Sequence, residues 1–193
     1  MKENFSKKIL TPSVFLNDVG FFVSKTPGII GAMRNKKISS AFKEKIMIVT
    51  SAVNGCVYCS WFHAKQSISS GISEEEVKNM LNLQFHADAS DFEIIALLYA
   101  QHYAETDRNP DSEMTSKLFG YYGDKTSKHI LLFIRMIFFG NLLGNTWDAM
   151  ISRFKGKPAA NSSLIFEVIV FLLTFWFMIP TVYLAKEKKL SNY

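Results

Sequence analysis

The chain contains two cysteines, and they lie three residues apart, with a histidine four residues further on. The stretch reads Cys56-Val57-Tyr58-Cys59-Ser60-Trp61-Phe62-His63. Positions i, i+3 and i+7 project from one face of a helix, so Cys56, Cys59 and His63 are predicted to lie together. Thiols at this spacing can form a reversible disulfide, which requires Cα atoms within about 7 Å. The pattern therefore predicts dithiol chemistry.

The surroundings of this stretch favour a reactive thiol. Gly55 is predicted to end the preceding helix, which places both cysteines in the first turn of the next one. The positive end of a helix favours thiolate over thiol, and His63 can accept or relay its proton. Glu44, on the preceding apolar helix, either faces solvent or serves as the acid/base that orients His63.

Two other interpretations of the cysteines remain open. Free cysteines often serve as small buried apolar residues. Cys56, Cys59 and His63, with Glu44, also have the right types for a zinc site, although no second ligand pair accompanies them. The remaining histidines lie outside this spacing and are predicted to be surface or core residues: His86, His102 and His129.

The elements that must position these residues are helices. Apolar residues recur at spacings of three and four while strand-like alternation is scarce, so an all-α fold is predicted. A first helix over about residues 12–25 is expected to end at Pro27 and Gly28. Capping boxes are predicted at Ser73 with Glu76 and at Ser90 with Glu93.

Length and charge narrow the function classes. With 193 residues, 48% of them hydrophobic, the chain is long enough to form one domain with a buried hydrophobic core. The net charge is +6 over residues 1–45, −5 over 46–152 and +4 over 153–193. Because the central part is acidic, we expect no nucleic-acid partner. The predicted division is an N-terminal helical arm (1–38), the CxxC domain (39–157) and an apolar C-terminal helix (158–193).

The segment 164–185 is long enough to span a bilayer and carries one charge, Glu167. It is predicted either to contact a membrane or to be buried against protein. No secretory signal is predicted at the start of the chain, since Pro12, Asn17 and Asp18 interrupt the apolar run. A cytoplasmic protein is therefore expected, with membrane association through this segment as the alternative, and its thiols meet a reducing compartment.

Glu44, the Cys56-Val57-Tyr58-Cys59 motif and His63 together resemble the signature of the AhpD-like alkylhydroperoxidases, within the carboxymuconolactone decarboxylase superfamily. The similarity covers roughly Phe42 to Leu81 closely. A later stretch, from Gly140 to Asp148, also resembles longer family members.

The resemblance implies an all-helical domain that forms a trimer or hexamer and acts as a thiol-dependent peroxidase or disulfide reductase. Cys59 would attack the hydroperoxide and Cys56 would resolve the product, while His63 and Glu44 relay the proton and Tyr58 lines the site. No metal or cofactor is expected, because an external dithiol or reductant protein regenerates the pair and no nucleotide loop is visible. The alternative is a non-enzymatic redox-sensing or membrane-associated interaction protein using the same cysteines.

Overall fold

The fold is built from α-helices, as the apolar periodicity predicts. The computed structural model describes residues 5–85, 89–160 and 162–187, with side chains as far as Thr181 in the last stretch. Those residues form eight helices and no strand. The helices are α1 (Pro12–Ser24), α2 (Thr26–Met33), α3 (Ser40–Asn54), α4 (Val57–Ser69), α5 (Glu74–Leu81), α6 (Asp91–Glu105), α7 (Ser112–Phe154) and α8 (Leu164–Glu187).

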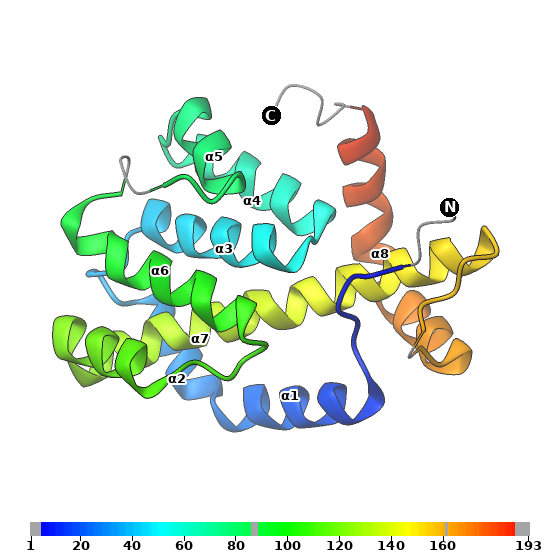
Figure 1. Cartoon of the computed structure of the whole chain (residues 1–193), viewed down its shortest axis with the longest axis horizontal. Helices are drawn as coiled ribbons and strands as arrows, with labels where there is room; N and C mark the ends of the chain where they lie inside the picture. The colour runs from blue at the N-terminus through cyan, green and yellow to red at the C-terminus, as the bar shows by residue number, and fades with distance from the viewer. Residues whose placement is uncertain (1–4, 86–88, 161, 188–193) are drawn as a thin grey trace.

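Helix α7 forms the axis of the molecule. It runs across the centre, with α3, α4 and α5 on one side and α1 and α2 on the other (Figure 1). It is kinked at Gly123, whose φ of 74° and ψ of 164° are not helical. Beyond the kink its inner face is apolar and buried, with Ile130, Phe133 and Phe138 exposed by 1% or less. The core therefore lies between α7 and the helices α3 and α6.

Local signals explain where α3 begins and ends. The hydroxyl of Ser39 accepts a hydrogen bond from the amide of Phe42 at 3.0 Å, which caps the helix. Gly55 ends it in the left-handed conformation, with φ at 65°, which glycine adopts without steric cost. These two residues therefore set the length of the helix that carries Glu44 and the point where α4 can start.

The first helix, predicted over about residues 12–25, is confirmed as α1 (Pro12–Ser24). Two finer predictions are wrong. Pro27 does not mark the break; it lies in the first turn of α2, where its missing amide hydrogen costs nothing. The Ser90 hydroxyl makes no capping hydrogen bond, and Glu93 instead binds Lys45 at 2.8 Å. Lys45 is 8% exposed and also binds Glu76 at 2.6 Å, so a buried cation draws both carboxylates across the fold.

At Ser73 the capping hydroxyl does bond the Glu76 amide, at 3.1 Å. The Glu76 carboxylate itself pairs with Lys45. The first half of this predicted box is confirmed, and the carboxylate of its second half is used in an ion pair instead.

Helix α8 crosses the C-terminal half of α7 (Figure 1). The rings of Trp147 and Phe171 stack with centroids 4.0 Å apart, and Glu167 is 1% exposed and bound to Arg153 at 2.7 Å. Within the described residues two helices are long and apolar enough to cross a membrane. In α7, 67% of the most apolar stretch is buried, so this helix belongs to the core. In α8, only 17% of the stretch 164–181 is buried.

Candidate active site

The two cysteines are joined at the start of α4. Cys56 and Cys59 form a disulfide, with Cα atoms 5.4 Å apart. Cys56 is the N-cap residue, and its sulfur accepts a hydrogen bond from the Cys59 amide at 3.3 Å. Cys56 is fully buried, whereas Cys59 is half-buried. One sulfur is therefore enclosed by protein and the other is partly accessible.

A histidine–carboxylate pair lies between α3 and α4. The Nδ1 atom of His63 is 2.6 Å from Oε2 of Glu44. The two side chains are 15% and 10% exposed, respectively, so the pair is largely shielded from water. Glu44 thus faces the neighbouring helix rather than solvent, and its contact holds the imidazole in one orientation. The packing of α3 against α4 brings these two predicted residues together across nineteen positions of sequence.

Tyr58 points toward α7 and away from solvent. Its hydroxyl donates a hydrogen bond of 2.6 Å to Asp148, whose other oxygen binds Lys7 at 2.6 Å. Burial, and then the Asp148 carboxylate, raise the pKa of Tyr58 well above its usual range. The phenol therefore stays protonated and acts as a hydrogen-bond donor. The sequence predicts no role for Asp148 or Lys7, although Asp148 ends the stretch 140–148 that resembles longer family members.

Gly144 of α7 lies against the disulfide. A Cβ atom at this position would lie 2.6 Å from the Cys56 sulfur and 3.5 Å from the Cys59 sulfur. Two fully buried asparagines near Gly144 join α7 to α3: Asn145 donates to the Asn54 carbonyl at 2.9 Å, and Asn141 accepts from Ser51 at 2.9 Å. Any side chain larger than that of glycine would therefore crowd the Cys56 sulfur at this point of α7.

Comparison with known families identifies this segment. Residues 29–101 match the family described as the Carboxymuconolactone decarboxylase family. The match covers fewer than half of the residues of the chain, so the similarity to this family is a property of this segment. The family includes enzymes, among them decarboxylases and alkylhydroperoxidases. Comparisons with curated proteins and with solved structures returned no match.

The segment that matches this family contains the disulfide, Tyr58 and the His63–Glu44 pair. Gly144 and Asp148 come from α7, which follows the matched residues in sequence. The site is therefore completed by a helix outside the part of the chain that the family description covers.

The described residues contain no group of three histidine, cysteine or acidic side chains that could hold a metal ion. The zinc interpretation therefore receives no geometric support, since the two sulfurs are bonded to each other and His63 faces Glu44. Of the other histidines, His102 binds Asp111 at 3.1 Å, and His129 is buried with its Nδ1 atom 3.0 Å from the Asn35 amide nitrogen. His86 lies outside the described residues.

Proposed function

We propose that the protein is a thiol-dependent peroxidase that reduces alkyl hydroperoxides through Cys59 and Cys56. The observation that supports this best is a disulfide at the start of the helix that also carries a shielded histidine–carboxylate pair, within a segment that matches the carboxymuconolactone decarboxylase family. The chemistry needs no bound cofactor, because an external dithiol can return the disulfide to two thiols by exchange.

In the first step the Cys59 thiolate attacks the terminal oxygen of the hydroperoxide. The O–O bond breaks, Cys59 becomes a sulfenic acid, and the leaving alkoxide takes a proton to form an alcohol. Cys59 suits this role because it is the more accessible of the two sulfurs. Cys56 then attacks the sulfenic acid, forming the disulfide and releasing water. The amide hydrogen bond from Cys59 to the Cys56 sulfur favours the thiolate that this second step needs.

The proton for the leaving alkoxide comes from His63. Its Nδ1 atom faces Glu44, so Nε2 is the ring atom that exchanges the proton, directly or through a water. Glu44 holds the ring and stabilises the imidazolium, as a carboxylate does in other histidine pairs. Tyr58, protonated and bound to Asp148, is a fixed polar wall of the site rather than a proton donor.

The test is peroxide consumption by the purified full-length protein with cumene hydroperoxide and dithiothreitol. We expect turnover that Cys59→Ser abolishes and that His63→Gln and Glu44→Gln each lower about 100- to 10,000-fold, the usual contribution of a positioned acid/base. His102→Gln is the matched control, because that histidine pairs with Asp111 away from the dithiol. Equal rates for His63→Gln and His102→Gln would show that the relay assignment is wrong.

The same experiment separates the enzyme from a redox sensor. A sensor would form the disulfide with one equivalent of peroxide and would not turn over in excess dithiol. Its oxidation would change the assembly state instead, which size-exclusion chromatography of the oxidised and reduced protein would detect. Disulfide formation without turnover would therefore replace the peroxidase proposal with the sensor.

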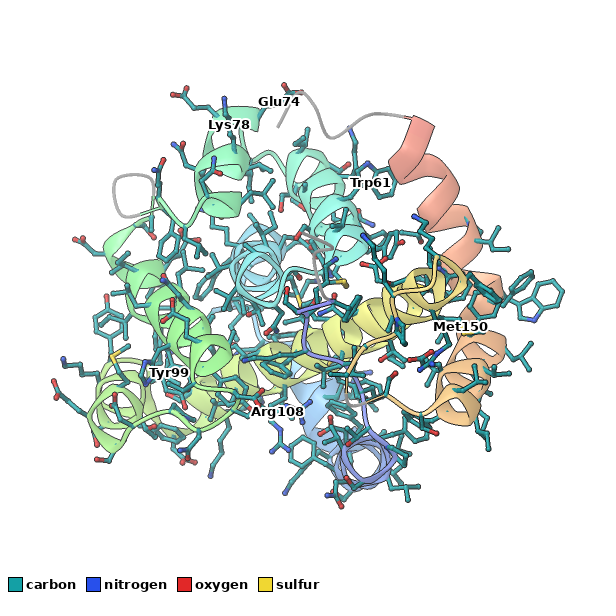
Figure 2. All side chains as sticks on the ribbon, turned by 45° about the vertical axis from the view of Figure 1, so that its right-hand side comes forward. Trp61, Glu74, Lys78, Tyr99, Arg108 and Met150 are labelled. Carbon is teal, nitrogen blue, oxygen red and sulfur yellow. A yellow bond between two sulfur atoms is a disulfide. The ribbon has the colours of Figure 1, made fainter. Side chains whose placement is uncertain are left out.

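We also propose that the outer face of α8 contacts a membrane. The inner face is anchored by Val170 and Met178, which are 1% and 5% exposed. The outer face carries large apolar side chains, among them Ile165, Leu173 and Trp176, exposed by 74%, 65% and 85%. Side chains along this helix project away from the body of the molecule (Figure 2). A contiguous apolar surface of this kind marks a contact with lipid or protein.

Charge favours lipid as the occupant of this face. Lys155 and Lys157 are exposed just before α8, and basic residues beside an apolar helix attract anionic headgroups. Flotation with vesicles of phosphatidylcholine and phosphatidylglycerol tests the contact. We expect the wild-type protein to float and a Leu173→Ser/Trp176→Ser variant to remain unbound. A Leu16→Ser/Val23→Ser variant, changed at equally exposed positions of α1, is the control. Wild-type protein that stays unbound as a homo-oligomer would refute the membrane contact.

A further inference from the structure

A second candidate binding site lies on the opposite side of α7 from the dithiol. It is a cleft of about 700 Å³ between α1 and α2, the end of α6 and the part of α7 that follows the kink. This volume is in the range of small-molecule sites. The cleft shares no lining residue with the disulfide or the His63–Glu44 pair. Figure 2 labels two of its residues, Tyr99 on α6 and Arg108 in the loop that follows.

The cleft has an excess of positive charge. Five lining side chains are cationic: Lys25, Arg108, Lys125, Lys128 and Arg135. Lys128 is paired with Asp124 at 2.7 Å, and Arg108 with the buried Asp18 at 2.8 Å. Among the described residues, the other three cations have no carboxylate within ion-pair distance.

The two arginines retain unused hydrogen-bond donors inside the protein. Nη2 of Arg108 and Nε of Arg135 are both buried, and neither has a hydrogen-bond partner among the described residues. A buried N–H without an acceptor costs free energy, so such groups require an explanation. A guanidinium presents its donors in a planar fork that matches a carboxylate. Both groups thus have the chemistry to bind an anion.

Packing holds the arginines in place. The guanidinium carbon of Arg135 lies 3.4 Å from the centroid of the Phe21 ring, and that of Arg108 lies 4.5 Å from the Phe138 ring. Arg108 has a left-handed backbone, with φ at 71°, which is uncommon for a residue other than glycine. Residues held in such conformations cluster at binding sites. The donors are therefore fixed before any ligand arrives.

Most of the remaining lining is apolar or aromatic, including Phe21, Tyr99, Tyr103 and Leu132. The other polar residues are Thr115, His129 and Asp124, and the Asp124 carboxylate is paired with Lys128. Burial raises the pKa of Tyr103, and the nearby Arg135 and Arg108 oppose that rise, which places both cations within electrostatic range of its hydroxyl. An apolar body with one anionic group matches this combination. We propose that the cleft binds a small organic acid whose carboxylate contacts Arg135 and Arg108 and whose apolar part lies against Phe21, Tyr99 and Leu132.

Isothermal titration calorimetry of the full-length protein with decanoate tests this site. We expect one decanoate per chain, with decanol, its neutral analogue, binding at least tenfold more weakly. Arg135→Met keeps an apolar stem and removes the charge, and should weaken decanoate binding about ten- to a hundredfold. Lys117→Met is the matched control, because Lys117 lies on α7 outside the cleft and pairs with Glu113; its affinity should equal that of the wild type.

Lys125→Met keeps the test decisive if Arg135→Met does not fold. Lys125 is exposed and lines the cleft, so its loss should weaken decanoate binding about two- to fivefold without affecting the fold. Equal binding of decanol and decanoate, or affinities unchanged in every folded cleft variant, would overturn the proposal. Inorganic phosphate that binds as tightly as decanoate would refute the apolar part, and decyl phosphate that binds more tightly than decanoate would reassign the headgroup.

Discussion

Two glycines one turn apart on α7 differ in what their substitution by alanine should do. A Cβ atom at Gly140 would meet nothing within 4 Å, whereas at Gly144 it would lie 2.6 Å from the Cys56 sulfur. Both positions are helical, so alanine gains about 0.5–1 kcal/mol at each by lowering the conformational entropy of the unfolded chain. Only at Gly144 is that gain opposed by a steric conflict.

The conflict at Gly144 determines the sign of the effect. Forcing an extra methyl group into a packed core typically costs about 1–3 kcal/mol. Subtracting the helix gain leaves Gly144→Ala about 1 kcal/mol less stable than the wild type. Gly140→Ala should be about 0.5–1 kcal/mol more stable. The two variants thus differ by about 2 kcal/mol although they make the same substitution in the same helix.

Urea denaturation of the oxidised proteins measures this difference, with unchanged m-values as the sign that the unfolded state is comparable. Repeating it in dithiothreitol adds a second check. Reduction frees the Cys56 sulfur to rotate away from the new methyl group, so the gap between the two variants should shrink. If Gly144→Ala is stabilised as much as Gly140→Ala in the oxidised protein, α7 does not contact the disulfide as closely as the structure has it.

Three further predictions concern single hydrogen bonds. Burial lowers the pKa of His129, and the Asn35 amide donates to its unprotonated Nδ1. The free energy of unfolding of the wild type therefore has its full contribution from this group above about pH 6.5 and decreases as the pH falls below that value. His129→Gln should flatten this dependence in urea denaturation from pH 8 to 5; an equal slope in both proteins would contradict it. Asp148→Asn should lower the pKa of Tyr58, which burial still keeps above its usual value, in an ultraviolet titration of the phenol; an unchanged titration would mean that the contact does not form. Ser39→Ala should lower the free energy of unfolding by about 1 kcal/mol, because the helix cap is lost. An unchanged free energy of unfolding would show that this hydrogen bond does not stabilise the protein.

The helices and the cysteine site could be predicted because the signals for them are local. The Ser39 cap, the Gly55 stop and the three-and-four spacing of apolar residues act within one or two turns. The spacing of Cys56 and Cys59 likewise limits how far apart their sulfurs can be. The wrong prediction at Ser90 shows the limit of this reasoning, because a buried cation elsewhere in the sequence draws the Glu93 carboxylate away from the helix start.

The sequence by itself determined that the protein is all-helical and that both cysteines lie in one short stretch, close enough to form a disulfide. Only the tertiary structure decided what surrounds that stretch. The hydrogen bond from Tyr58 to Asp148 joins residues 90 positions apart, and the approach of Gly144 to Cys56 depends on how α7 lies against α4. The arginine-lined cleft and the exposed face of α8 arise in the same way. Local periodicity predicts which residues share a helix face, but only the packing of helices decides which faces meet and which remain open.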